Sequence, residues 1–269
     1  MASEPEYISS QQNAKIKNVV LLQKKFGARK EQQLIVIEGI KELGIAVANG
    51  FEIDSLFFCH EIIKDRAQFN EIVATMKPMK QISVSAEVFA KIAYREDSGG
   101  VVALAKPTYC SFQEVSLPKN PLILVLDGVE KPGNLGAVLR TMDAVAADLL
   151  IVCDTQTDIY NPNVIRASIG CVFSKKIVVC SSTEAIDWLQ QHHIHIFAAA
   201  LQTTQFYHQA DYSGPSALVF GTESTGLTPI WLKAATVVVK IPMLGTIDSL
   251  NVSNSLAIVA YEAKRQRGF

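Results

Sequence analysis

The chain has 269 residues, of which 49% are hydrophobic, and its formal net charge is −1. This composition suits one large domain or two modest ones and excludes a mainly disordered chain. Because no apolar run reaches the roughly 20 residues of a membrane span and the N-terminus lacks the apolar core of a signal peptide, we expect a cytoplasmic protein with no membrane partner.

The N-terminal region is basic. Six basic residues and no acidic residue lie between Gln11 and Lys30, although the whole chain is nearly neutral. We predict a loose end followed by a basic amphipathic helix over residues 1–33. The charge run is typical either of a solvated helix face or of a surface that contacts phosphates. On the second interpretation the candidate contacts are Lys15, Lys17, Lys24 and Lys25.

Short β-rich runs then alternate with helical stretches, which predicts a compact α/β unit. The expected strands are 34–38, 55–59, 81–84 and 101–105, and the expected helices are 40–48, 62–76 and 87–93. Residues 106–121 carry three prolines without sustained periodicity and therefore predict a linker. We divide the chain into a first domain over 1–107, a linker over 108–120 and a second domain over 121–269.

The second domain contains several almost wholly apolar runs, which are typical of strands covered on both faces, as in a parallel sheet. They fall at 122–129, 149–153, 176–180, 194–201, 217–221 and 236–242, with helical stretches at 135–147, 163–169, 183–191 and 250–267. This alternation predicts an α/β fold with a mostly parallel sheet and helices on both faces.

The cysteines and histidines do not indicate a metal site. The five cysteines are odd in number and form no C-x-x-C pair, which favours buried, reduced thiols over a disulfide framework or a zinc site. His192, His193 and His195 lie together without a placed carboxylate or cysteine partner, so we interpret them as surface residues at a helix end. We expect no metal.

Three segments of the second domain are candidates for chemistry, because ligands of open α/β sheets bind beyond the carboxyl ends of strands. The first, residues 127–144, has a glycine-rich turn, Asn134 near a helix start and Arg140 six residues later. It contains neither the dinucleotide-binding nor the P-loop fingerprint. The alternative is a simple turn in which Asn134 caps the helix.

The other two segments also combine glycine with polar residues. Residues 218–227 place Gly221, Glu223 and Gly226 after a strand, where backbone groups and a carboxylate could contact an adenosine-like ligand. In residues 241–262, a loop leads into a polar cluster at the start of a long apolar helix. That cluster consists of Ser249, Asn251 and Ser253. A plain βα turn and ordinary helix caps are the alternatives.

Together the three segments resemble the motifs of the SpoU/TrmH family of RNA 2′-O-ribose methyltransferases, within the SPOUT class. The patterns N-x-G-x-x-x-R, F-G-x-E-x-x-G and I-P-M-x-G-x-x-x-S-L-N-V-S occur in the family's order and spacing over residues 120–267. The resemblance implies S-adenosylmethionine as cofactor, a homodimer that pairs through the second domain, and a deep trefoil knot in that SPOUT domain.

The first domain resembles the smaller, ribosomal-protein-like substrate-binding domain of many ribosomal-RNA members. The similarity rests on IEGIKEL (37–43) and GGVVAL (99–104). Many relatives carry an acidic residue and alanine where this chain has Gly44 and Ile45. The resemblance implies that this domain binds RNA.

The resemblance also assigns roles to single residues. It implies that Arg140 holds the target phosphate, Asn134 orients the ribose hydroxyl and Glu223 shapes the site by hydrogen bonding. Ser249 and Asn251 would lie near the reacting atoms. The residues implied to line the adenosine pocket are Leu201, Gly221, Ile241, Met243 and Leu250, and Arg166, in NPNVIRAS, would face the RNA. Since arginine is almost always protonated, clamping a phosphate suits Arg140 better than accepting a proton.

We therefore expect an enzyme that transfers a methyl group from S-adenosylmethionine to a ribose 2′-hydroxyl, with ribosomal RNA as the favoured partner. Transfer RNA is an alternative substrate, a modification that confers antibiotic resistance stays open, and a non-catalytic RNA-binding factor is the alternative from another class. A nucleotide-binding oxidoreductase is disfavoured, because the chain lacks the glycine fingerprint and the acidic residue expected about 20 residues later.

Overall fold

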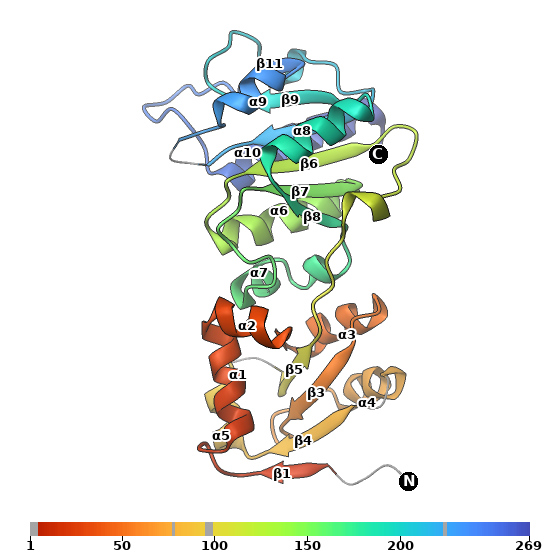
Figure 1. The fold of residues 1–269 in the computed structure, drawn as a ribbon, viewed down its shortest axis with the longest axis vertical. Coiled ribbons are helices and arrows are strands. Elements are labelled where there is room, and N and C mark those ends of the chain that lie inside the picture. The colour runs from red at the N-terminus through yellow and green to blue at the C-terminus, as the bar shows by residue number, and fades with distance from the viewer. Residues whose placement is uncertain (1–4, 77–78, 95–98, 223–224) are drawn as a thin grey trace. The chain divides into compact units, whose positions relative to one another are not determined.

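The computed structural model describes residues 5–76, 79–94, 99–222 and 225–269 (Figure 1). The chain divides into two compact units. One comprises the described residues up to Thr108 together with Asp158–Ser174, and the other comprises Tyr109–Thr157 together with Lys175–Phe269. The sequence-based division placed residues 158–174 in the second domain, whereas their contacts lie in the first unit.

The first unit contains a five-stranded mixed sheet in the order β1-β4-β3-β5-β2. Strands β1, β4 and β3 run parallel, and β5 is antiparallel to both of its neighbours. The strands are β1 (Glu6–Ile8), β2 (Ile35–Glu38), β3 (Ile53–Phe58), β4 (Lys80–Val84) and β5 (Val101–Ala105). The helices before residue 108 are α1 (Ala14–Lys24), α2 (Phe26–Gln32), α3 (Ile40–Ala48), α4 (Arg66–Thr75) and α5 (Ala86–Ile92).

The N-terminal region differs from the expected loose end and single helix. Residues Glu6–Ile8 form an edge strand, and two helices follow instead of one. Helix α1 begins after Asn13, whose side chain accepts a hydrogen bond from the Lys15 backbone nitrogen, and it ends where Lys25 adopts an extended conformation (φ −119, ψ 112). Helix α1 buries Ile16, Val19 and Leu22. Burial of these apolar side chains, rather than the run of charges, therefore determines which face of the helix is turned toward the core.

Residues 158–174 complete the first unit with helix α7 (Pro162–Ala167) and the 3-10 turn η2 (Cys171–Phe173). The side chains of Arg29 and Asp158 are 4% and 7% exposed and form an ion pair at 2.8 Å. The ring of Phe51 packs edge-on against Phe173 at a centroid distance of 5.0 Å and against Tyr160 at 6.0 Å. A buried ion pair and an aromatic cluster therefore hold this segment to the first unit.

The second unit is built on a six-stranded sheet in the order β11-β9-β10-β6-β7-β8, in which every neighbouring pair is parallel. The strands are β6 (Leu122–Asp127), β7 (Leu149–Cys153), β8 (Ile177–Cys180), β9 (His195–Ala199), β10 (Ser216–Phe220) and β11 (Val237–Val239). The main helices are α6 (Pro132–Ala144), α8 (Ser182–Gln191), α9 (Pro229–Ala234) and α10 (Val252–Arg267). The predicted parallel α/β sheet is confirmed, and the trefoil knot stays a prediction.

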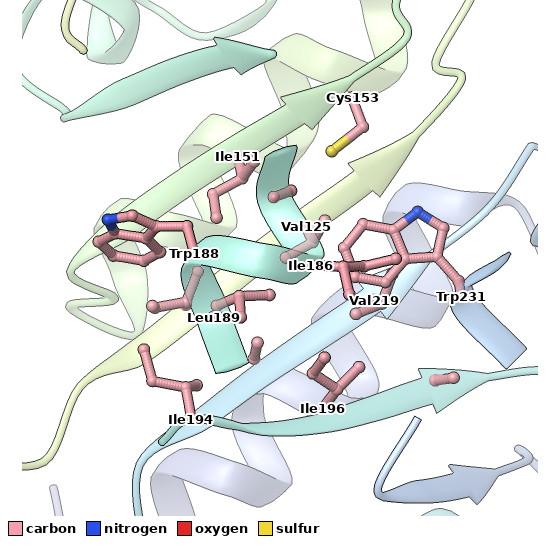
Figure 2. Close-up of a cluster of buried hydrophobic side chains, with 14 of the residues drawn as sticks. Val125, Ile151, Cys153, Ile186, Trp188, Leu189, Ile194, Ile196, Val219 and Trp231 are labelled. Carbon is pink, nitrogen blue, oxygen red and sulfur yellow. The ribbon is translucent and has the colours of Figure 1, made fainter. Parts of the chain in front are cut away.

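Helices cover both faces of this sheet. On one face, Trp188 of α8 and Trp231 of α9 pack with alternate strand residues such as Val125, Ile151 and Val219 (Figure 2). Helix α10 packs against β10 and α6. Because side chains on both faces of the sheet are buried, nearly every residue in the sequence of each strand is apolar. Within the described ranges, no helix is long and apolar enough to cross a membrane.

The expected linker is packed rather than extended. It contains the 3-10 turn η1 (Phe112–Glu114), and Cys110 forms a parallel bridge with Val178 next to the sheet edge. The ring of Phe112 stacks on Trp188 at a centroid distance of 4.6 Å and an interplanar angle of 16°. These contacts tie residues 109–115 to the second unit, although prolines and missing periodicity indicated a linker.

Candidate active site

The site lies at the edge of the second sheet where its parallel strands end. A cavity of about 330 Å³ opens beyond the carboxyl ends of β9, β10 and β11. Such a volume is within the range of small-molecule sites. All five residues that the resemblance placed around adenosine line it: Leu201, Gly221, Ile241, Met243 and Leu250. The structure thus brings together residues from three separate segments.

A smaller cavity of about 80 Å³ adjoins the first. Asn134 and Lys131, at the start of α6, line this cavity together with Asp127 at the end of β6. The two cavities share a wall. The residues common to both linings are Phe220, Gly221, Thr222 and Val252. The arrangement can hold two different groups side by side.

Gly221 and Thr222 of the shared wall lead into a tight turn after β10, and Val252 of α10 completes the wall. The backbone nitrogen of Thr222 donates to the Gly226 carbonyl at 3.2 Å, and the Gly226 nitrogen donates back at 3.0 Å. A Cβ atom at Gly221 would lie 2.1 Å from the Gly226 oxygen, so only glycine fits there. Glu223, the predicted carboxylate of this turn, lies outside the described residues.

Asn251 joins the third segment to the first. Its Oδ1 accepts hydrogen bonds from the backbone nitrogen and the hydroxyl of Ser253 at 3.0 and 2.6 Å, which caps α10. Its Nδ2 donates to the Oδ1 of Asn134 at 3.1 Å. The N-cap of α6 is Lys131, so the alternative in which Asn134 caps that helix is wrong. Ser249 is exposed, lines the larger cavity and donates to Asp248 at 3.3 Å.

Arg140 lies apart from this cluster. It is exposed on α6 and is absent from the described lining of both cavities. Asp127 also lines the smaller cavity, although the sequence motifs did not single it out. It is 3% exposed at the floor of the smaller cavity. The available signal was a charged residue at the carboxyl end of an apolar strand.

The basic run of the first unit splits into two kinds of residue. All four lysines predicted to contact RNA are exposed, and one of them, Lys15, forms an ion pair with Glu6. Arg29, from the same run, is buried in its pair with Asp158. Arg166 belongs to this unit through α7, is exposed, and places its guanidinium 5.7 Å from the ring centroid of Tyr94.

Cys153, Cys180 and His192 have structural partners, and His192, His193 and His195 are all exposed. Cys153 and Cys180 lie opposite each other in β7 and β8, and the hydrogen bond between their thiols, together with burial, raises the pKa of Cys153 well above its usual range. The Nδ1 of His192 lies 2.8 Å from the Trp188 carbonyl oxygen. In the part of the chain that the structure describes, no three metal-binding side chains come together.

The fold and this site place the chain in the SpoU rRNA methylase family. The family model matches residues 121–261, and a model for an MRM3-like substrate binding domain matches residues 13–103. The chain is 32% identical over 220 residues to the 23S rRNA (guanosine-2′-O-)-methyltransferase RlmB of Ralstonia nicotianae, which covers 80% of this chain and 88% of the relative.

A second relative is the 23S rRNA (uridine(2479)-2′-O)-methyltransferase of Streptomyces viridochromogenes. It is 27% identical over 240 residues, which are 86% of this chain and 83% of the relative. Among solved structures, an RNA 2′-O ribose methyltransferase matches with a TM-score of 0.85 and 36% identity, covering 97% of this chain and 99% of that one. An AdoMet-bound rRNA methyltransferase from Sinorhizobium meliloti matches with a TM-score of 0.89 and 26% identity, covering 98% of both chains.

Proposed function

We propose that this chain transfers a methyl group from S-adenosylmethionine to a ribose 2′-hydroxyl of ribosomal RNA. The observation that carries the proposal is the pair of adjoining cavities with Asn134 and Asn251 hydrogen-bonded beside them. Family membership supports the reaction, and the names of the relatives support ribosomal RNA over transfer RNA. Because ribosomes work there, we keep the cytoplasm as the expected location.

The larger cavity fits the donor. Its volume suits a nucleoside with an amino-acid tail, and the close packing of Gly221 against the backbone of Gly226 and Leu227 fixes one part of its wall. Ile241, Met243 and Leu250 supply apolar surface from the third segment, and Leu201 closes the end of β9. When bound, the donor supplies an electrophilic methyl group on its sulfonium.

The smaller cavity is assigned to the ribose that accepts the methyl group. The amides of Asn134 and Asn251 orient the hydroxyl, since holding reactants in line removes much of the entropic part of the barrier. Ser249, in the lining of the larger cavity, faces the donor. Arg140, exposed on α6, clamps the target phosphate through its planar guanidinium. Glu223 keeps its expected hydrogen-bonding role.

The first unit is assigned to RNA capture. The exposed lysines of α1 and its C-terminal end lie on a unit whose family model is a substrate-binding domain. Arg166, stacked near Tyr94, adds a guanidinium and an aromatic ring to this unit. Single-stranded RNA is commonly held by such stacking surfaces together with phosphate contacts.

We also propose a homodimer through the second unit. Leu244 and Ile247, in the third segment, are 98% and 66% exposed, and Tyr261 projects from α10 at 46%. Exposed large apolar side chains commonly gather at protein interfaces, so these three residues are candidates for a dimer contact. Light scattering at micromolar concentration should give twice the chain mass. An active monomer would contradict the dimer.

The function is tested by incubating the full chain with labelled S-adenosylmethionine and either ribosomal or transfer RNA, and by mapping the 2′-O-methylated nucleotide. Asn134→Ala and Arg140→Ala should each lose transfer while they retain the fold and donor binding. Label on transfer RNA alone would redirect the substrate assignment. Binding of NAD in place of S-adenosylmethionine, or binding of RNA without transfer, would support the alternatives instead.

A further inference from the structure

Asp127 is a buried carboxylate with three hydrogen-bond donors from distant parts of the chain. Its Oδ2 accepts from the backbone nitrogen of Thr228 at 2.9 Å and from the Thr228 hydroxyl at 2.8 Å. Its Oδ1 accepts from the Ser182 hydroxyl at 3.0 Å. A buried charge persists only when such partners replace its lost water, so these bonds fix the three residues relative to one another.

The same network reaches the helices on one face of the sheet. The Ser182 hydroxyl also accepts a hydrogen bond from the indole nitrogen of Trp231 at 3.1 Å, and the Ser182 backbone nitrogen donates to Asp154 at 2.9 Å. Trp231 is fully buried in the core cluster (Figure 2). Asp127 therefore connects the end of β6 to the start of α8 and, through Thr228, to the start of α9.

Thr228 closely follows the turn that begins in the shared wall at Gly221 and Thr222. The first end of that turn is fixed by β10, whose last residue, Phe220, pairs with β6 and β9 in the sheet. The other end is fixed by the two bonds from Thr228 to Asp127. The neighbouring Gly128, at φ +70, lies close to Thr222, since a Cβ added there would be only 3.1 Å from the Thr222 methyl group. The turn is thus held at both ends and approached closely from the side of β6.

We propose that Asp127 is a positioning residue that holds the wall between the donor cavity and the acceptor cavity. This assignment rests on the proposed function, because it takes the larger cavity as the donor site. Asp127 acts through Thr228: without their hydrogen bonds, the turn is released at its second end and the donor cavity changes shape. The donor then binds more weakly, while RNA capture by the first unit is unaffected.

The test compares Thr228→Val with Thr228→Ser in the full chain. Thr228 is exposed, so neither substitution disturbs the core. Valine keeps the shape and removes the hydroxyl donor to Asp127, whereas serine keeps that donor. Asp154→Asn is the matched control, because Asp154 contacts the same Ser182 but is exposed and does not appear in the described lining of either cavity.

The readouts are the dissociation constant for S-adenosylmethionine by calorimetry, the KM for each substrate, and the melting temperature. Thr228→Val should weaken donor binding by about tenfold and raise the donor KM, with the RNA KM unchanged. Thr228→Ser and Asp154→Asn should stay within about twofold of the natural chain. Asp127→Asn, which keeps the shape and removes the charge, should resemble Thr228→Val if it folds.

Two results would overturn the assignment while the proposed function stands. The first is that the Thr228→Val chain binds the donor with the same dissociation constant as the natural chain, whatever the two melting temperatures are. The second is that the Thr228→Ser chain binds the donor as weakly as the Thr228→Val chain does, because the hydroxyl would then not be the relevant group. If the natural chain itself fails to bind S-adenosylmethionine, the proposed function falls, and the assignment of Asp127 falls with it.

Discussion

Replacing Gly221 with alanine should distort the donor cavity. The added Cβ would lie 2.1 Å from the Gly226 carbonyl oxygen, 2.2 Å from its carbon and 2.3 Å from the Leu227 nitrogen. All three atoms belong to the backbone, so no side-chain rotation relieves the clash. To reach even a tight contact, the opposite limb of the turn must retreat by about 1 Å, at the roughly 1–3 kcal/mol typical of overpacked sites.

That displacement moves residues that line the larger cavity, since Gly226 and Leu227 are both part of its wall. If the donor must restore the original turn in order to bind, its affinity falls by the same free energy, which is roughly 5- to 150-fold. Isothermal titration with S-adenosylmethionine measures the loss, and thermal unfolding shows that the variant is folded at the temperature used.

Gly245→Ala is the matched control for this prediction. Gly245 lies in the loop between Met243 and Ser249, two residues that line the larger cavity, but a Cβ there has no neighbour within 4 Å among the described atoms. This variant should bind the donor as the natural chain does. If Gly221→Ala also binds normally, the close approach at Gly221 does not shape the donor site, and the reasoning is refuted.

Three further outcomes follow from the described contacts. In the native chain at pH 8, iodoacetamide should spare Cys153, because its hydrogen bond to Cys180 and its burial raise its pKa and leave little thiolate; mass spectrometry that finds it modified as fast as Cys180 would contradict this. Changing the four exposed lysines of the basic run to glutamine should weaken RNA binding. It should also lower the slope of log affinity against log salt by roughly 0.7–0.9 for each phosphate that the protein no longer neutralises. Filter binding at several salt concentrations measures both effects. Arg29→Met should destabilise the first unit by about 3–5 kcal/mol in urea titration, because it leaves the buried carboxylate of Asp158 unpaired; an unchanged transition would count against the pair.

The family resemblance named residues that line the larger cavity, and the strand pattern explains why they come together. Each segment that carries its lining follows a strand of a parallel sheet, and parallel strands end at one edge, so motif order and strand order together bring Gly221 and Met243 to the same place. The same reasoning places Asp127 at this edge of the sheet, but it does not predict the hydrogen bonds that Asp127 accepts. Its partners Ser182 and Thr228 are 55 and 101 residues away, and local patterns do not encode which distant donors will meet a carboxylate.

The same limit explains why the sequence did not show the two helices of the N-terminal region or the contacts that residues 158–174 make. In the sequence, Arg29 is one more cation in a basic run, yet its partner Asp158 lies 129 residues away in a segment between two strands of the second unit. Periodicity reports which face of an element is buried, but not what it is buried against. The sequence pattern predicted a helix over 163–169, which the structure has as α7, and only the three-dimensional contacts show that residues 158–174 pack with the first unit.

Asn251 shows why a helix cap and a functional residue need not be alternatives. Two donors of Ser253 fix the carbonyl end of its amide, and this cap orients the nitrogen end toward Asn134. The start of α10 therefore holds a hydrogen-bond donor rigidly, since rotating the amide would sacrifice the cap. A polar residue at a helix start is usually only a cap. Here the cap supplies the rigidity that the role proposed for Asn251, orienting a ribose hydroxyl, would require, because misplacement by about 1 Å is costly for catalysis.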